Sequence, residues 1–271
     1  MIPPHTQGLI LDMDGVLWRG DEPIGDLPRI YARILKRGLK VVFATNNGTR
    51  TPQQYVERLA SFEVNVEPWQ VVTSALAVAE LVEKALTPSP LPVGEGPGVR
   101  GVFAIGETGV MEALRAKGIE PLPIERADEA QAVVMGIDRQ VNFEKMCAAT
   151  LLVRRGLPFY ATNPDKTFPT PRGEIPGAGA WISVVITATG IEPIYAGKPS
   201  PYLLELARQR LSTAREETLV VGDRLETDIA GGQAAGMPVA LVLSGVSTWE
   251  QAEAWRPDVD VIAEDLAGLV K

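Results

Sequence analysis

The chain has 271 residues and a formal net charge of −8, with 45% hydrophobic and 22% charged residues. This length fits one large domain or two of modest size, and we expect two. The composition is typical of a globular chain that buries an apolar core. The acidic balance argues against sequence-independent binding to nucleic acid or to an anionic membrane, because both require a basic surface.

The chain has one cysteine and one histidine, which limits the kinds of catalytic and metal site that it can form. Cys147 has no partner for an internal disulfide, and helical spacing in its segment predicts a core thiol. With no leader pattern and no apolar run of about 18 residues, we expect a cytoplasmic protein. His5 is the one histidine, so a Ser-His-Asp triad or a His-rich metal site has no other histidine to use. Hydrolytic chemistry is therefore expected to depend on carboxylates.

Short β-rich apolar runs alternate with longer helical patterns along the chain, which predicts βαβ units around a parallel sheet. Helices are expected to end at Gly38 and Gly156, a capping box is expected at 247–250, and a loop is expected at 168–179. The expected strands are 9–11, 40–45, 101–106, 132–137, 158–162, 218–223 and 239–244. The expected helices are 29–38, 53–62, 75–86, 143–156 and 201–211.

Residues 87–100, TPSPLPVGEGPGVR, differ from their surroundings. They contain four prolines and no hydrophobic period. The G-E-G-P-G within them is not a nucleotide loop, because no strand precedes it and Pro97 removes an amide that a phosphate would need. We expect a flexible surface insertion.

Two acidic residues directly follow the first expected strand. In 9-LILDMDGVLWRG-20, Asp12 and Asp14 stand two residues apart, which turns both side chains to the same side of an extended segment. Open α/β sheets bind ligands beyond the carboxyl ends of their strands. Two unit charges about 4 Å apart repel by roughly 4 kcal/mol at an effective dielectric near 20, so a cation is expected beside them. Taken alone, the pair also fits a simple turn before Gly15.

A second strand end carries two more carboxylates. In 218-TLVVGDRLETDIAGG-232, an apolar run leads into Asp223, and Asp228 follows at the start of a helical segment. Asp223 alone also suits a helix cap, and Asp228 a first-turn acid favoured by the helix dipole. Oxygen ligands from separate strands are typical of Mg²⁺. Together with Asp12 and Asp14, these residues predict a magnesium site.

Two further strand ends offer groups that bind anions. Thr45 and Asn46 supply a hydroxyl, an amide and backbone N–H groups after the strand expected at 40–45. Lys198 stands before Pro199, which can open the following helix, and offers a fixed positive charge to a phosphoryl group. Each residue alone also fits a turn or a surface position. Together, the two acidic strand ends and these two anion-binding strand ends favour a site that binds and reacts with a phosphoryl group.

These segments together resemble the haloacid dehalogenase-like (HAD) phosphohydrolases, in their nitrophenyl-phosphatase-like and phosphoglycolate-phosphatase-like branch. The motifs that carry the resemblance are LDMDGVLWRG, FATNNGTRTP, ATNPD, GKPSPYLL and VVGDRLETDIAGG. It covers nearly the whole chain, interrupted mainly by 87–100. It implies an α/β fold with a Rossmann-like parallel-sheet core and a smaller inserted α/β cap. We expect the core at 1–78 and 190–271 and the cap at 79–189.

The resemblance also implies catalytic roles. Asp12 is expected to attack phosphorus and become an aspartyl phosphate, and Asp14 to act as general acid and then base. Mg²⁺ is expected at the Asp12 carboxylate, the Asp14 backbone carbonyl and Asp223, with Asp228 in support.

Binding roles follow from the same resemblance. Thr45, Asn46 and Lys198 match the phosphate-binding positions. In the cap, 160-YATNPD-165 makes Asn163 and Asp165 candidate substrate contacts, although its likeness to 43-FATNNG-48 also fits common turn chemistry. The expected partner is a small phosphorylated metabolite, with neither nucleic acid nor membrane, and self-association is left open.

The favoured function is a Mg²⁺-dependent phosphatase acting on small phosphomonoesters. Haloacid dehalogenation fits less well, because displacement of halide needs neither a metal nor the leaving-group acid that Asp14 offers. A phosphotransferase or phosphomutase shares the aspartyl intermediate and differs only in the acceptor. A catalytically idle small-ligand-binding protein is the alternative from another class, and the complete set of acidic residues argues against it.

Overall fold

The structure is a computed structural model that describes residues 2–86, 100–170 and 173–271. The chain forms two compact units, each built around its own parallel sheet. Unit 1 comprises Met1–Asn46, Pro52–Thr73 and Gly197–Lys271, and unit 2 comprises Asn47–Thr51 and Ser74–Ala196. The main boundaries thus fall at 73/74 and 196/197, where 78/79 and 189/190 were expected.

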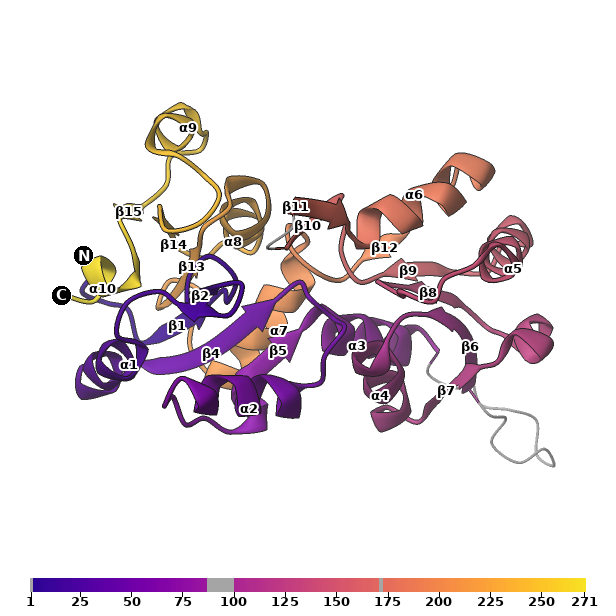
Figure 1. The fold of residues 1–271 in the computed structure, drawn as a ribbon, viewed down its shortest axis with the longest axis horizontal. Coiled ribbons are helices and arrows are strands. Elements are labelled where there is room, and N and C mark those ends of the chain that lie inside the picture. Colours follow the sequence, from indigo (N-terminus) through magenta and orange to yellow (C-terminus); the bar gives the residue numbers. More distant parts are fainter. Residues whose placement is uncertain (1, 87–99, 171–172) are drawn as a thin grey trace. The chain divides into compact units, whose positions relative to one another are not determined.

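Unit 1 is built on a six-stranded sheet in the order β15-β14-β13-β1-β4-β5, with every neighbouring pair parallel. Figure 1 shows β1 beside β4 within this sheet. The sheet strands are β1 (Gly8–Leu11), β4 (Lys40–Thr45), β5 (Val71–Thr73), β13 (Thr218–Gly222), β14 (Val239–Val242) and β15 (Val261–Ala263). Because β1 is buried along its whole length, its sequence GLIL is an unbroken apolar run.

The helices of unit 1 supply apolar faces to the core around this sheet. In α1, Leu27, Ile30 and Ile34 recur at helical spacing and are buried. The helices are α1 (Leu27–Lys36), α2 (Pro52–Ser61), η1 (Pro68–Gln70), α7 (Pro201–Leu211), the π-helical turn η3 (Leu225–Ile229), α8 (Ala230–Ala234), α9 (Trp249–Ala254) and α10 (Leu266–Leu269). A short hairpin, β2 (Trp18–Arg19) and β3 (Glu22–Pro23), follows β1.

Unit 2 has a five-stranded parallel sheet in the order β12-β9-β8-β6-β7. Its strands are β6 (Arg100–Ile105), β7 (Ile119–Leu122), β8 (Val133–Met135), β9 (Phe159–Ala161) and β12 (Ile194–Tyr195). Its helices are α3 (Ser74–Ala85), α4 (Thr108–Ala116), η2 (Ile124–Glu129), α5 (Phe143–Arg154) and α6 (Ala178–Thr189). The expected α/β fold, a parallel-sheet core with a second α/β unit inserted in the chain, is confirmed.

Three local predictions are wrong. The loop expected at 168–179 contains an antiparallel hairpin of β10 (Thr167–Thr170) and β11 (Gly173–Pro176). The capping box lies one residue later, at Thr248 and Gln251, because the Ser247 hydroxyl accepts a hydrogen bond from the Leu225 N–H instead. Cys147 is half-buried, because α5 turns this face outward, with Phe143 and Leu151 at 83% and 61% exposure.

The flexible insertion predicted at 87–100 lies outside the described residues except for Arg100, which opens β6. In the part of the chain that is described, every helix is too short or too polar to cross a membrane.

Candidate active site

Two adjacent strands of unit 1 place the first two carboxylates. β1 pairs in parallel with β13, with Leu11 opposite Val221, so Asp12 and Asp223 leave the same edge of the sheet. The Asp12 N–H continues this pairing by donating to the Val221 carbonyl at 2.9 Å. Both side chains therefore lie where parallel α/β sheets bind ligands.

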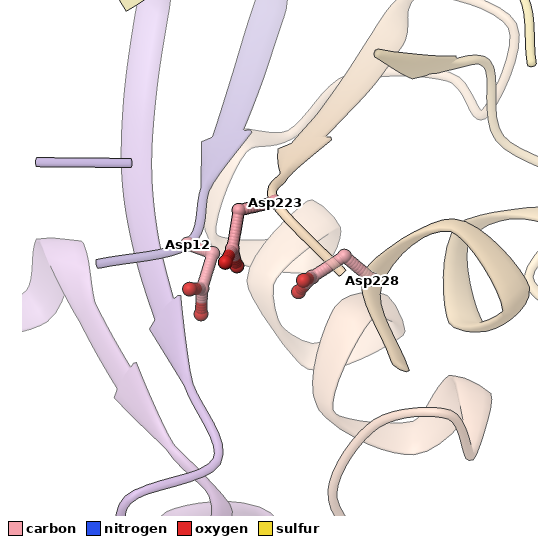
Figure 2. A group of neighbouring side chains, drawn as sticks. All are labelled: Asp12, Asp223 and Asp228. Carbon is pink, nitrogen blue, oxygen red and sulfur yellow. The ribbon is translucent and has the colours of Figure 1, made fainter. Parts of the chain in front are cut away.

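Asp228 joins them from the π-helical turn that follows β13. Carboxylate oxygens of Asp12, Asp223 and Asp228 all lie within 4.8 Å of one another, and all three residues are buried. Figure 2 shows the three side chains converging from their separate segments. Single-turn π-helices are frequent at functional sites. The prediction that distant acidic residues meet at one point is confirmed for these three side chains.

Lys198 provides the positive charge among them. It is 2% exposed, and its Nζ donates to Asp12 Oδ1 and Asp228 Oδ1, both at 2.5 Å, and to the Ala44 carbonyl at 3.2 Å. The Asn46 side chain holds the lysine backbone in place: its Oδ1 accepts from the Lys198 N–H at 2.8 Å, and its Nδ2 donates to the Lys198 carbonyl at 2.9 Å. A buried ammonium thus bridges two of the three carboxylates.

Asp223 is fixed by the loop after β14, which contains none of the predicted site residues. Its Oδ2 accepts from the Val246 N–H at 2.8 Å, and its carbonyl accepts from the Ser247 N–H at 3.0 Å. A Cβ at Gly245 would lie 1.8 Å from Asp223 Oδ2, and one at Gly15 2.4 Å from the same oxygen. Glycine at both positions therefore allows the backbone to enclose this carboxylate.

Burial and mutual repulsion change how these groups bind protons. Desolvation by burial raises the pKa of Asp12 well above its usual value. The positive charge of Lys198 lowers this pKa, but less than burial raises it, and the negative charges of Asp228 and Asp223 raise it further. Desolvation and the charge of Asp228 raise the pKa of Asp223 to about 6. Burial alone would lower the pKa of Lys198, but the carboxylates of Asp12 and Asp228 outweigh burial and raise it. Lys198 is therefore a permanent cation.

Asp14 lies in the turn after Asp12, and its side chain has a different partner. Its Oδ1 accepts a hydrogen bond from the indole Nε1 of Trp18 at 2.9 Å. Next to it, the Gly15 carbonyl accepts from the Ser244 hydroxyl at 2.7 Å. Trp18 and Ser244 were not among the predicted site residues. The spacing of four residues between Asp14 and Trp18 in a Gly-containing turn was the available signal for Trp18.

The other predicted residues lie at strand ends. Thr45 ends β4 and is 2% exposed. In unit 2, Asn163 follows β9 and is buried, and its Oδ1 accepts from the Asp165 N–H at 3.1 Å. This bond closes an Asx turn, which is the common turn chemistry considered for this segment. A substrate contact by Asn163 or Asp165 stays a prediction.

Comparison with known proteins identifies the family. A model of haloacid dehalogenase-like hydrolases matches residues 9–120, and a HAD-hydrolase-like model matches 195–269. The chain is 35% identical over 244 residues to the 5'-nucleotidase YutF of Bacillus subtilis, covering 90% of both proteins. The chain belongs to the haloacid dehalogenase-like hydrolase family. It is also 36% identical to an acid sugar phosphatase of Staphylococcus aureus, covering 90% of this chain and 89% of the relative.

Solved structures of HAD phosphatases share the fold. The p-nitrophenyl phosphatase from Archaeoglobus fulgidus superposes with a TM-score of 0.87 at 33% identity, over 98% of this chain and 99% of that one. The glycerol phosphate phosphatase of Mycobacterium tuberculosis in complex with magnesium gives a TM-score of 0.87 at 32% identity, over 98% of this chain and 76% of that one. The chain is therefore a HAD-family phosphoric monoester hydrolase.

Proposed function

We propose that this HAD phosphatase hydrolyses small phosphomonoesters with Mg²⁺ through an aspartyl-phosphate intermediate on Asp12. The observation that carries the proposal is the buried cluster in which Asp12 contacts Lys198 and lies within 4.8 Å of Asp223 and Asp228. A carboxylate nucleophile divides hydrolysis into two easier steps. Asp12 attacks phosphorus, and Asp14 protonates the leaving oxygen and then activates water.

The three carboxylates fit a divalent cation. Their oxygens are hard anionic ligands, and Lys198 already places a cation against two of them. The Asp12 carboxylate, the Asp14 backbone carbonyl and Asp223, with Asp228 in support, would hold Mg²⁺, which when bound offsets negative charge on the phosphoryl oxygens. Lys198 and Thr45 would bind the same oxygens, and Asn46 keeps Lys198 in position through the backbone.

Small organic phosphates are the proposed substrates. The printed names of the relatives include a 5'-nucleotidase, an acid sugar phosphatase and a glycerol phosphate phosphatase. These substrates share a phosphate on an alkyl oxygen, whose departure as an alkoxide needs a proton donor. Within unit 2, which we propose as the cap, Asn163 and Asp165 are the proposed substrate contacts.

Metal removal tests the proposed function. With p-nitrophenyl phosphate and excess Mg²⁺, the protein is expected to release inorganic phosphate, and EDTA should lower the rate by at least about 100-fold. Restoring Mg²⁺ should restore turnover, which controls for damage by the chelator. An equal rate of phosphate release with and without EDTA would contradict the metal requirement.

Magnesium binding should weaken in acid. The pKa of Asp223 is raised to about 6 in the metal-free protein, so below that pH the carboxyl must lose a proton before it can bind a cation. One such proton lowers the apparent affinity by about tenfold per pH unit below the pKa. Calorimetric titration with Mg²⁺ at pH 5 and pH 7.5 measures this change, and equal affinities would contradict the assignment of Asp223 as a ligand.

A further inference from the structure

Trp18 is held against Asp14 by the turn between them. The Leu17 N–H donates to the Met13 carbonyl and the Gly15 N–H to the Trp18 carbonyl, both at 2.8 Å. This compact turn brings the indole Nε1 to 2.9 Å from Asp14 Oδ1. Trp18 is fully buried, and a buried indole N–H needs an acceptor. In this protein the acceptor is the carboxyl group proposed as the general acid.

The side chains of Arg58 and Phe62 hold the indole ring of Trp18 in place. The guanidinium carbon of Arg58, in α2, lies 4.3 Å from the centroid of the Trp18 ring, and the Phe62 ring lies 5.8 Å away. The Arg58 guanidinium also donates to the Gly20 carbonyl, so it is itself anchored. A cation over the ring draws electron density from the indole and makes its N–H a stronger donor. The indole therefore offers Asp14 one well-oriented hydrogen bond.

We propose that Trp18 is a positioning residue for the proton transfers of Asp14, an inference that rests on the proposed function. The indole N–H bonds Oδ1, which leaves Oδ2 to carry the proton. As the Asp12 oxygen bonds phosphorus and the bond to the leaving oxygen breaks, the proton passes from Oδ2 to that oxygen. Asp14 becomes a carboxylate, and its bond to the indole strengthens because the acceptor is now charged.

The hydrogen bond from the indole to Asp14 also serves the second half of the reaction, in which the proton moves in the opposite direction. The Asp14 carboxylate takes a proton from the water whose oxygen attacks phosphorus, and Asp12 leaves as a carboxylate. The indole again holds Oδ1, so the proton returns to Oδ2. Trp18 would thus support both proton transfers without contacting the substrate.

Substrates with different leaving groups distinguish a role of Trp18 in proton transfer from a purely structural role. A nitrophenolate leaves with little help from an acid, whereas an alkoxide requires a proton. Trp18→Phe keeps an aromatic ring and removes the N–H, so kcat/KM for glycerol phosphate, which reports the step in which the leaving group departs, should fall about 10- to 100-fold. For p-nitrophenyl phosphate, kcat/KM should fall less than about threefold. Trp255→Phe is the matched control, since it removes an indole bond to Gln233 Oε1 at 3.1 Å and should leave the ratio of the two kcat/KM values unchanged.

A second variant keeps the indole in place. Arg58→Met removes the cation above the ring and should shift the ratio of the two kcat/KM values in the same direction, by about two- to threefold. An unchanged ratio in every variant that folds would overturn the role of Trp18. If the wild-type protein hydrolyses neither substrate, the proposed function fails instead. If Asp14→Asn lowers kcat/KM equally for both substrates, the acid role of Asp14 is the part that fails.

Discussion

Asp12→Asn is expected to lower kcat by roughly four orders of magnitude or more, as removal of a covalent nucleophile does. The amide keeps the shape of the side chain, and its oxygen can still accept from Lys198, but it cannot attack phosphorus. The folded protein should be at least as stable, because the variant removes one of three clustered buried carboxylates. Phosphate release and thermal unfolding measure the two effects.

Asp138→Asn provides the matched control for this change. Asp138 is also buried and also accepts from a lysine, with Lys145 Nζ at 2.7 Å from its Oδ2, but it belongs to unit 2. Its kcat should stay within about twofold of the wild-type value. Substantial turnover by a folded Asp12→Asn protein would remove Asp12 from the chemistry.

Lys198→Met should have the largest effect on stability. In metal-free buffer it leaves the carboxylates of Asp12 and Asp228 buried without their shared cation, at an expected cost of about 3–5 kcal/mol in the free energy of unfolding. Mg²⁺ should recover part of this loss, because it binds the folded protein and replaces the missing positive charge. Urea unfolding with and without Mg²⁺ measures both quantities, and kcat should also fall by about 100-fold or more.

Lys145→Met is the comparison for Lys198. The Lys145 side chain is 33% exposed and pairs with Asp138 alone among acidic side chains of the described residues, and Asp138 keeps a hydrogen bond from the Gln140 N–H. The loss of Lys145 should therefore cost less than the loss of Lys198, about 1–3 kcal/mol, and show no recovery with Mg²⁺. A Lys198→Met protein as stable as wild type without metal would show that the lysine does not offset the clustered charges.

The long strands of both sheets were predictable because buried parallel strands are continuous apolar runs. KVVFAT and TLVVG are such runs, and they became β4 and β13. β5, β7, β12 and β15 were missed because none is a separate buried apolar run. The VVT of β5 continues directly into the apolar helix α3, the IEPL of β7 contains Glu and Pro, β12 has two residues, and β15 is only half-buried. The β10–β11 hairpin was missed because its prolines and glycines are typical of loops.

The charged cluster was predictable for a topological reason. Asp12 and Asp223 each follow an apolar strand, and parallel strands end at one edge of a sheet, so their proximity follows from the pattern. The bond between Trp18 and Asp14 depends on a side-chain orientation within a turn, and the hold of Val246 on Asp223 depends on contacts between distant segments. Neither has a periodic signature in the sequence.

Reductive trapping of the enzyme during turnover tests the role of Asp12 most directly. Borohydride reduces an acyl phosphate to an alcohol, so the aspartyl-phosphate mechanism predicts homoserine at position 12. The modification should form with substrate and Mg²⁺, and it should be absent without substrate and in Asp12→Asn. Mass spectrometry of the peptide that contains residue 12 reports it. An unmodified Asp12 in enzyme that is rapidly releasing phosphate, or a reduced carboxylate at another position, would contradict the mechanism.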